Sequence, residues 1–236
     1  MRIEPEISAV TVVLRGAFNP SIFQPFWLVR NEVVTEDQGN SAQINIIHPQ
    51  ATEFDIPGQF SLHIDPTTFS ITRTEAPLIL AADAAVKIFS ELLPHTPIAQ
   101  LGINRTVHFS VGSSDERNRI GRLLAPIDPW GVWGTELSDG ESPNRPDQGG
   151  GLKSLTMLQP RPRDRQYGHV QATIEPSVLI QGGRSGIFMV VNDHFQTQDA
   201  GKPEPAEEMI DILADRFDES VRRSEAIIDQ VMALKK

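Results

Sequence analysis

Six histidines and many carboxylates are the side chains of this chain that could serve as general bases or metal ligands. The histidines are His48, His63, His95, His108, His169 and His194. No two of them share a ligand spacing such as His-x-x-x-His, and the chain has no cysteine for a thiolate ligand or nucleophile. The sequence therefore predicts no metal site, and it predicts no cofactor.

Hydrolysis is the one reaction for which the residues give a partial argument. His63 lies two positions before Asp65, and His194 follows Asp193, so each histidine has a carboxylate nearby that could orient it. The nucleophile motif Gly-x-Ser-x-Gly is absent, and the run Gly112-Ser113-Ser114 is more typical of a helix cap. We therefore expect a protein that is not an enzyme, with a His/Asp hydrolase as an alternative.

Glycine-rich runs bind phosphate when they join a strand to a helix. Residues 149–151 lie instead in a long polar segment, and residues 182–186 precede a strand. Residues 117–122 resemble the pyrophosphate loop of acetyltransferases, but Arg122 stands where that loop needs a small residue. The formal net charge of -10 argues against a nucleic-acid surface, and the basic residues that gather are Lys153, Arg161, Arg163 and Arg165.

One predicted strand, residues 101–111, carries the polar residues best suited to hold a ligand. Asn104 and His108 fall on its polar side, whereas Arg105 falls on its apolar side, where a cation needs a partner. A ligand anion there would make Arg105 functional, and an acidic side chain would make it structural; the candidates are Asp65, Glu175 and Asp193. Asn104, Arg105 and His108 are thus a candidate ligand face, and a small-ligand sensor using a concave sheet is a second alternative.

The elements that must position these residues occur twice in the same order. In the first pass we expect a strand at residues 7–14, a helix from Asn19, strands at 42–47, 59–65 and 68–74, and a helix at 80–93. In the second pass we expect a strand at 101–111, a helix from Ser113, strands at 152–158, 168–175 and 186–195, and a helix at 205–234. This order predicts an α+β fold of two pseudo-duplicated β-α-β-β-β-α halves, residues 1–96 and 97–236. Curved antiparallel sheets covered by helices, as in helix-grip and saddle-shaped folds, would result.

Two segments of the second half are candidates for contact with a partner. Residues 125–134 form an irregular segment with Trp130 and Trp133, and residues 135–151 form a long polar loop that we expect to be mobile. The C-terminal helix would be about 45 Å long, more than short strands need for cover. Its end could project and pair with another subunit, or the helix could bend around its own half. The candidate interaction residues are Trp130, Trp133, Phe217, Val221 and Ile228.

Three runs of the chain carry a resemblance to a known family. Residues 69–73 (FSITR), residues 98–105 (IAQLGINR) and residues 189–193 (MVVND), the last leading to a long helix, resemble a sporadically distributed bacterial family of uncharacterised proteins. The resemblance covers nearly the whole chain. It implies no agreed activity or site residues, but it does imply a place in bacterial accessory systems such as defence or toxin-antitoxin cassettes.

Composition sets the remaining expectations. No apolar run approaches the length of a membrane span, and the acidic start of the chain lacks the features of a signal peptide, so we expect a cytoplasmic protein. Nucleic acid is an unlikely partner for an acidic chain. The sequence therefore predicts a non-catalytic protein-interaction module of a bacterial accessory system, whose partner is another protein or a second copy bound through the C-terminal helix.

Overall fold

The computed structural model describes residues 3–137, 151–161, 167–180, 185–199 and 204–235. It shows an α+β fold with one large antiparallel sheet and a long C-terminal helix, which confirms the predicted fold class. Most of the predicted loop at residues 135–151 lies outside the described residues.

The first half of the chain contributes five strands. Strand β1 (Ile7–Gly16) is followed by a 3-10 turn (Pro20–Ile22), helices α1 (Pro25–Arg30) and α2 (Glu36–Asn40), and strands β2 (Gln43–His48), β3 (Ala51–Ile56), β4 (Phe60–Ile64) and β5 (Thr68–Arg73). Helix α3 (Leu80–Val86) continues as a π-helical turn (Lys87–Leu92).

The second half repeats this order with one strand fewer after its first helix. Strand β6 (Pro97–Ser110) is followed by α4 (Ser114–Leu124), a 3-10 turn (Asp128–Trp130), α5 (Gly131–Leu137), and strands β7 (Leu155–Pro160), β8 (Tyr167–Ser177) and β9 (Gly186–Gln196). The short β10 (Glu204–Pro205) pairs with β6, and helix α6 (Glu207–Met232) ends the fold.

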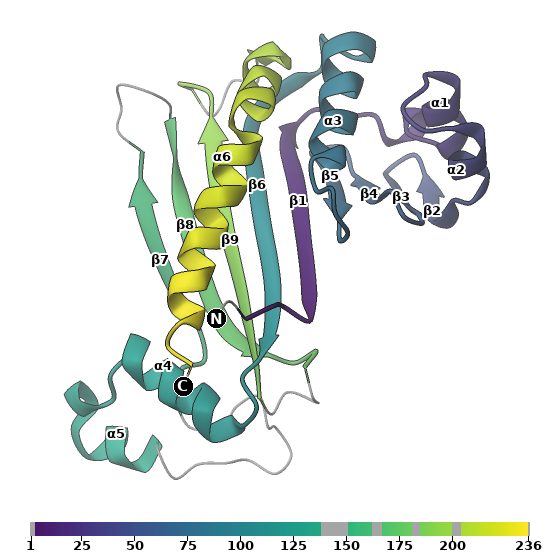
Figure 1. Cartoon of the computed structure of the whole chain (residues 1–236). Coiled ribbons are helices and arrows are strands. Elements are labelled where there is room, and N and C mark those ends of the chain that lie inside the picture. Colours follow the sequence, from purple (N-terminus) through teal and green to yellow (C-terminus); the bar gives the residue numbers. More distant parts are fainter. Residues whose placement is uncertain (1–2, 138–150, 162–166, 181–184, 200–203, 236) are drawn as a thin grey trace.

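The strand order shows how the two halves share one sheet. Strands are arranged β2-β3-β4-β5-β1-β6-β9-β8-β7, so the first strand of each half, β1 or β6, lies at the centre. These two pair directly, for example Val12 with Ile103, and each is flanked on its other side by the last long strand of its own half. Figure 1 shows β1 and β6 side by side, with the first half continuing beyond β1.

Two local predictions were wrong. The strand β3 was missed, because its sequence ATEFDI places two carboxylates, Glu53 and Asp55, where strands seldom carry them. Residues 128–137 were expected to be irregular, but they form the 3-10 turn and α5. A proline at the second position of that turn fixes a backbone angle compatible with helix.

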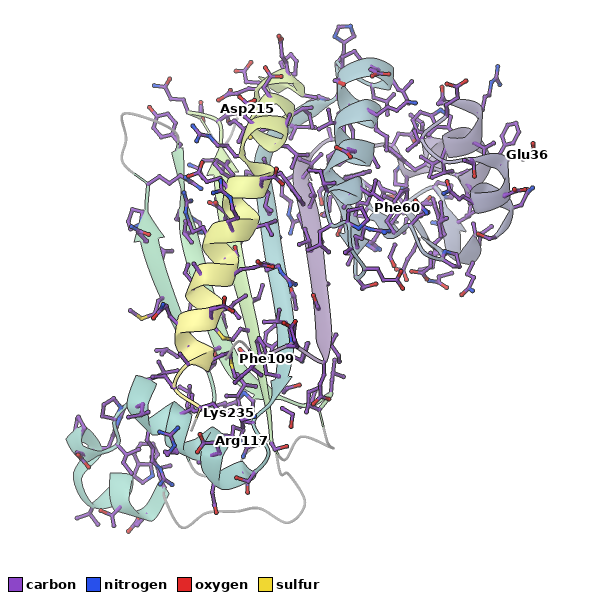
Figure 2. All side chains as sticks on the ribbon, viewed as in Figure 1. Glu36, Phe60, Phe109, Arg117, Asp215 and Lys235 are labelled. Carbon is purple, nitrogen blue, oxygen red and sulfur yellow. The ribbon has the colours of Figure 1, made fainter. Side chains whose placement is uncertain are left out.

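All strand-packing helices lie on one face of the sheet, which we call the covered face. Alternating residues such as Val10, Val12 and Leu14 of β1 point to that face and are buried. The core there has two parts, one beneath α3 and the first turns of α6, the other beneath α4 and the last turns of α6. Figure 2 labels one residue of each part, Phe60 and Phe109.

Helix α6 lies along β6 and β9 and joins the two parts of the core (Figure 1). Phe217 and Ile228 are each only 2% exposed, and Val221 is half-buried against the first part of the core. The prediction that these three residues form an interaction surface is therefore wrong, because the sheet of the same chain already covers them. The last turns of α6 do not project either, since Met232 is buried.

A buried charge sits between the two parts of the core. Asp193 of β9 is 1% exposed, and its Oδ2 accepts hydrogen bonds from Ser220 Oγ (2.8 Å) and Arg223 Nη1 (3.0 Å), both on α6. Its other oxygen contacts the guanidinium of Arg161, whose Cζ lies 4.0 Å from the centre of the Phe195 ring. We call Arg161, Asp193, Ser220 and Arg223 the Asp193 cluster. Burial, together with the charge of Arg223, lowers the pKa of Arg161 to about 10.

Replacing the buried carboxylate tests how strongly this cluster holds α6 on the sheet. Asp193→Ala leaves Arg161 and Arg223 without their shared partner, and we expect a loss of roughly 3–5 kcal/mol in the free energy of unfolding, measured with urea.

The matched control is Glu219→Ala, because Glu219 also binds Arg223 (2.7 Å) but its side chain is 42% exposed, against 1% for Asp193. We expect it to cost less than about 1 kcal/mol. Equal losses of unfolding free energy for Asp193→Ala and Glu219→Ala would show that the buried carboxylate of Asp193 is no more important than the more exposed one of Glu219.

Candidate functional site

The second face of the sheet, which we call the open face, presents mostly polar side chains. The helices and the 3-10 turn that contact strands do so on the covered face. On the open face, the polar residues lie on neighbouring strands from β3 to β8: Glu53, Asp55, Ser61, His63, Ser70, Thr72, Thr11, Asn104, Thr106, His108, Asn192, His194, His169, Gln171 and Thr173. Such a row can hydrogen-bond a polar partner across many strands.

The predicted ligand face is not one site, because its residues lie on opposite faces of the sheet. Asn104 and His108 are on the open face. Arg105 is buried on the covered face, where its Nη1 donates to the carbonyl oxygens of Ala9 and Thr106 (both 3.1 Å). Its Nε lies 3.6 Å from Glu225 Oε1 of α6. The acidic partner is therefore Glu225 and none of the three carboxylates proposed from the sequence.

At the centre of the open face two asparagines meet above a glycine. Asn104 Nδ2 donates to the carbonyl of Thr11 (3.4 Å). A Cβ on Gly102 would lie 3.1 Å from Asn192 Oδ1 and 3.3 Å from Asn104 Nδ2, so any larger residue would push these amides apart. Glycine at this position therefore lets the two amides lie close to the sheet.

The first-half side of the open face carries an acidic network. Asn45 Nδ2 donates to Glu53 Oε1 (3.2 Å) and to Asp55 Oδ2 (3.1 Å), and Glu53 Oε2 also lies 3.0 Å from His63 Nδ1. Ser61 Oγ donates to Asp55. The carboxylate that orients His63 is thus Glu53, and the nearby serine hydroxyl is directed to Asp55 and not to the histidine, so the network lacks the order of a hydrolase triad.

Asp65, the partner that the sequence suggested for His63, has a structural role instead. Its Oδ1 accepts hydrogen bonds from the backbone N–H groups of Thr67 (2.7 Å) and Thr68 (2.9 Å) in the turn between β4 and β5. Burial acts to raise the pKa of Asp65, but these hydrogen bonds outweigh it and lower the pKa below its usual value.

The second-half side of the open face contains three histidines. His108 Nδ1 lies 2.7 Å from Ser177 Oγ, and its ring packs 4.9 Å from the Phe188 ring. Both His108 and Ser177 are buried, and Ser177 also accepts a hydrogen bond from the N–H of Leu179, so this pair is a packing contact closed to substrate. Burial lowers the pKa of His108.

The other two histidines, His169 of β8 and His194 of β9, are directly opposite in the register. Their ring centres are 4.7 Å apart. Burial is the main cause that lowers the pKa of His194, and the charge of His169 acts in the same direction. The sequence did not predict this pair or the pair of His108 with Ser177, because the two residues of each pair are far apart in the chain. The register of the strands brings them together.

Trp130 and Trp133 lie on a helical arm at the end of the sheet where α4 packs (Figure 1). Their side chains are 62% and 54% exposed, with ring centres 5.3 Å apart in an edge-to-face arrangement. Val132, between them in the sequence, and Leu123, near the end of α4, are exposed as well. We call Leu123, Trp130, Val132 and Trp133 the tryptophan arm.

The arm is attached to the body through α4. Ile120 of α4 is fully buried, and Arg119 donates to the carbonyl oxygen of Leu234 at the end of α6. Gly134 packs so closely in α5 that an added Cβ would lie 2.2 Å from the carbonyl oxygen of Ile127. The segment that carries the two indoles is thus tightly folded, and it follows α4, whose Ile120 is buried in the core.

Comparisons with known proteins assign no role to these residues. No protein family model matches the chain, and no curated protein is similar to it. Among solved structures, the rolling circle replication initiator protein from Geobacillus stearothermophilus is similar at 11% identity and a TM-score of 0.31, over 90% of this chain and 79% of that one. A likeness of this size supports no conclusion about function. In the described part of the chain, no helix is long and apolar enough to cross a membrane.

Two histidines, the buried His108 and the half-buried His194, predict how stability depends on pH. Because the folded protein lowers the pKa of His108 and His194, the unfolded chain binds protons first as the pH falls through about 6.5. These two histidines should therefore leave stability unchanged between pH 7 and about pH 9, below the range in which Arg161 titrates, and should make it fall between pH 7 and pH 5. His194→Gln should reduce that fall, as measured by urea unfolding at each pH.

The effect of Asp65 on stability can be separated from that of the histidines by pH. The folded protein lowers the pKa of Asp65, so the stability that this carboxylate contributes is lost only as the pH falls below about 4. If His194→Gln keeps the full wild-type slope between pH 7 and pH 5, protonation of this histidine does not limit stability.

Proposed function

We propose that the chain is a non-catalytic protein-interaction module that binds another protein through the tryptophan arm. The observation that carries this proposal is the exposure of two adjacent indoles, Trp130 and Trp133, on a helical arm. An indole combines a large apolar surface with one N–H donor, and tryptophan is enriched among residues that dominate binding energy at interfaces.

The rest of the arm supports a protein partner over a small molecule. Val132, between the two tryptophans in the sequence, is 78% exposed, and Leu123 near the end of α4 is 54% exposed, so the arm carries further exposed apolar side chains. Exposed apolar surface of this kind is typical of a contact between macromolecules. The formal net charge of -10 disfavours a nucleic acid as that macromolecule, because phosphate groups would be repelled at long range.

The family resemblance supports a bacterial accessory system of the defence or toxin-antitoxin type as the setting. The partner would then be another protein of the same system. Helix α6 is left out of this surface, and a homodimer through α6 is not favoured, because the sheet of the same chain covers its residues Phe217, Val221 and Ile228.

Removal of both indoles tests the proposal. We expect the tagged full-length chain, purified from its native host, to retain one protein in stoichiometric amount, and Trp130→Ala/Trp133→Ala to weaken that complex by at least about 100-fold in Kd. Mass spectrometry identifies the protein, and calorimetry with the purified partner measures the affinity.

Val178→Ala/Leu179→Ala is the matched control, because it removes two side chains that are each 63% exposed elsewhere on the molecule. Its affinity should equal that of the wild type. A complex that survives loss of both indoles, or is lost equally in the control, would overturn the assignment of the surface.

A further inference from the structure

We infer that His169 and His194 together bind a divalent transition-metal cation on the open face of the sheet. Neither residue belongs to the tryptophan arm, so this site is independent of the proposed protein-binding function. Zn²⁺, Cu²⁺ and Ni²⁺ are the cations that favour imidazole ligands.

The spacing of the two rings suits one shared ion. His169 and His194 are opposite each other on adjacent antiparallel strands, with ring centres 4.7 Å apart and ring planes inclined by 33°. Two imidazoles that each bind one tetrahedral Zn²⁺ at about 2.0–2.1 Å have ring centres about 5 Å apart. The ring-centre distance is therefore close to that of two imidazoles sharing one ion, and β8 and β9 hold the two backbones directly opposite each other.

Neighbouring residues support the orientation of these ligands. The side chain of Gln196 hydrogen-bonds His194, which occupies one ring nitrogen and leaves the other for a metal. In metal-binding histidines, a hydrogen bond at the ring nitrogen that does not bind the metal commonly fixes the orientation of the ring. On the β6 side, the residue opposite His194 is Gly102, over which the amides of Asn104 and Asn192 lie.

One positive charge, that of Arg161, lies near the pair. Arg161 acts against a cation at this position, but its guanidinium contacts Asp193 and lies over Phe195, both of which point to the covered face. Asp193, which Arg223 also binds, offsets part of that charge.

Two histidines provide only part of a coordination shell. The remaining positions would be taken by water, as in metal sites that keep exchangeable positions. Gln171 and Asn192 are opposite each other on β8 and β9, two residues along each strand from the histidines, and therefore lie on the same face. Their side chains could hydrogen-bond such water. The site would therefore bind a metal ion reversibly.

Zn²⁺ titration of the purified full-length chain tests the inference. By calorimetry at pH 7.5 we expect one site per chain, and His169→Gln and His194→Gln should each weaken binding by at least about tenfold. The control is His63→Gln, since His63 lies on the same face but binds Glu53, and we expect wild-type affinity.

Paramagnetic Ni²⁺ locates the site without any substitution, and this protects the test against variants that fold poorly. In NMR spectra of the wild type, the signals of His169 and His194 should broaden at lower Ni²⁺ concentration than those of His63 and His108. Equal broadening of all four, or Zn²⁺ binding that the double variant His169→Gln/His194→Gln retains, would overturn the inference.

Discussion

The buried carboxylate of Asp193 determines how the long helix sits on the sheet. Apolar packing alone would let α6 slide, because apolar contacts are non-directional. Asp193 accepts from Ser220 and Arg223, which share one side of the helix, and Arg105 of the sheet meets Glu225 further along it. A slip of one residue would turn these groups by about 100° and leave buried charges unpaired. The polar contacts between the two parts of the core therefore fix the register of α6.

Fixing α6 in this way decides which surfaces remain for partners. The pseudo-duplication places β1 and β6 at the centre of one sheet, and α3 and α6 end the two halves on the same face. The opposite face is left to polar side chains such as Asn104 and Asn192. The helical arm, which lies outside these two layers, presents the exposed indoles of Trp130 and Trp133.

Alternating patterns in the sequence predicted most strands and correctly placed Asn104 and His108 on a polar face, because side chains alternate along a strand. The contact between Arg105 and Glu225 could not be predicted in the same way. It depends on the rotation of α6 over the sheet, which only the packed structure determines. His169 and His194 meet for a similar reason, since their contact follows from the register of β8 against β9. The sequence thus indicates which face a residue is on more reliably than which residue it touches.

The length of α6 illustrates the same limit. The helix seemed too long for a sheet of five-residue strands, and a projecting end was one expectation from the sequence. Its 26 residues span about 39 Å at 1.5 Å per residue, whereas the 14 residues of β6 span about 46 Å. The helix is therefore matched to the longest strand of its own sheet, and its apolar residues are used along that whole length. A partner of this protein must bind where the fold leaves side chains uncovered. Among the described residues the tryptophan arm is one such place, and exposed apolar side chains such as Ile44 of β2 and Met157 of β7 are others.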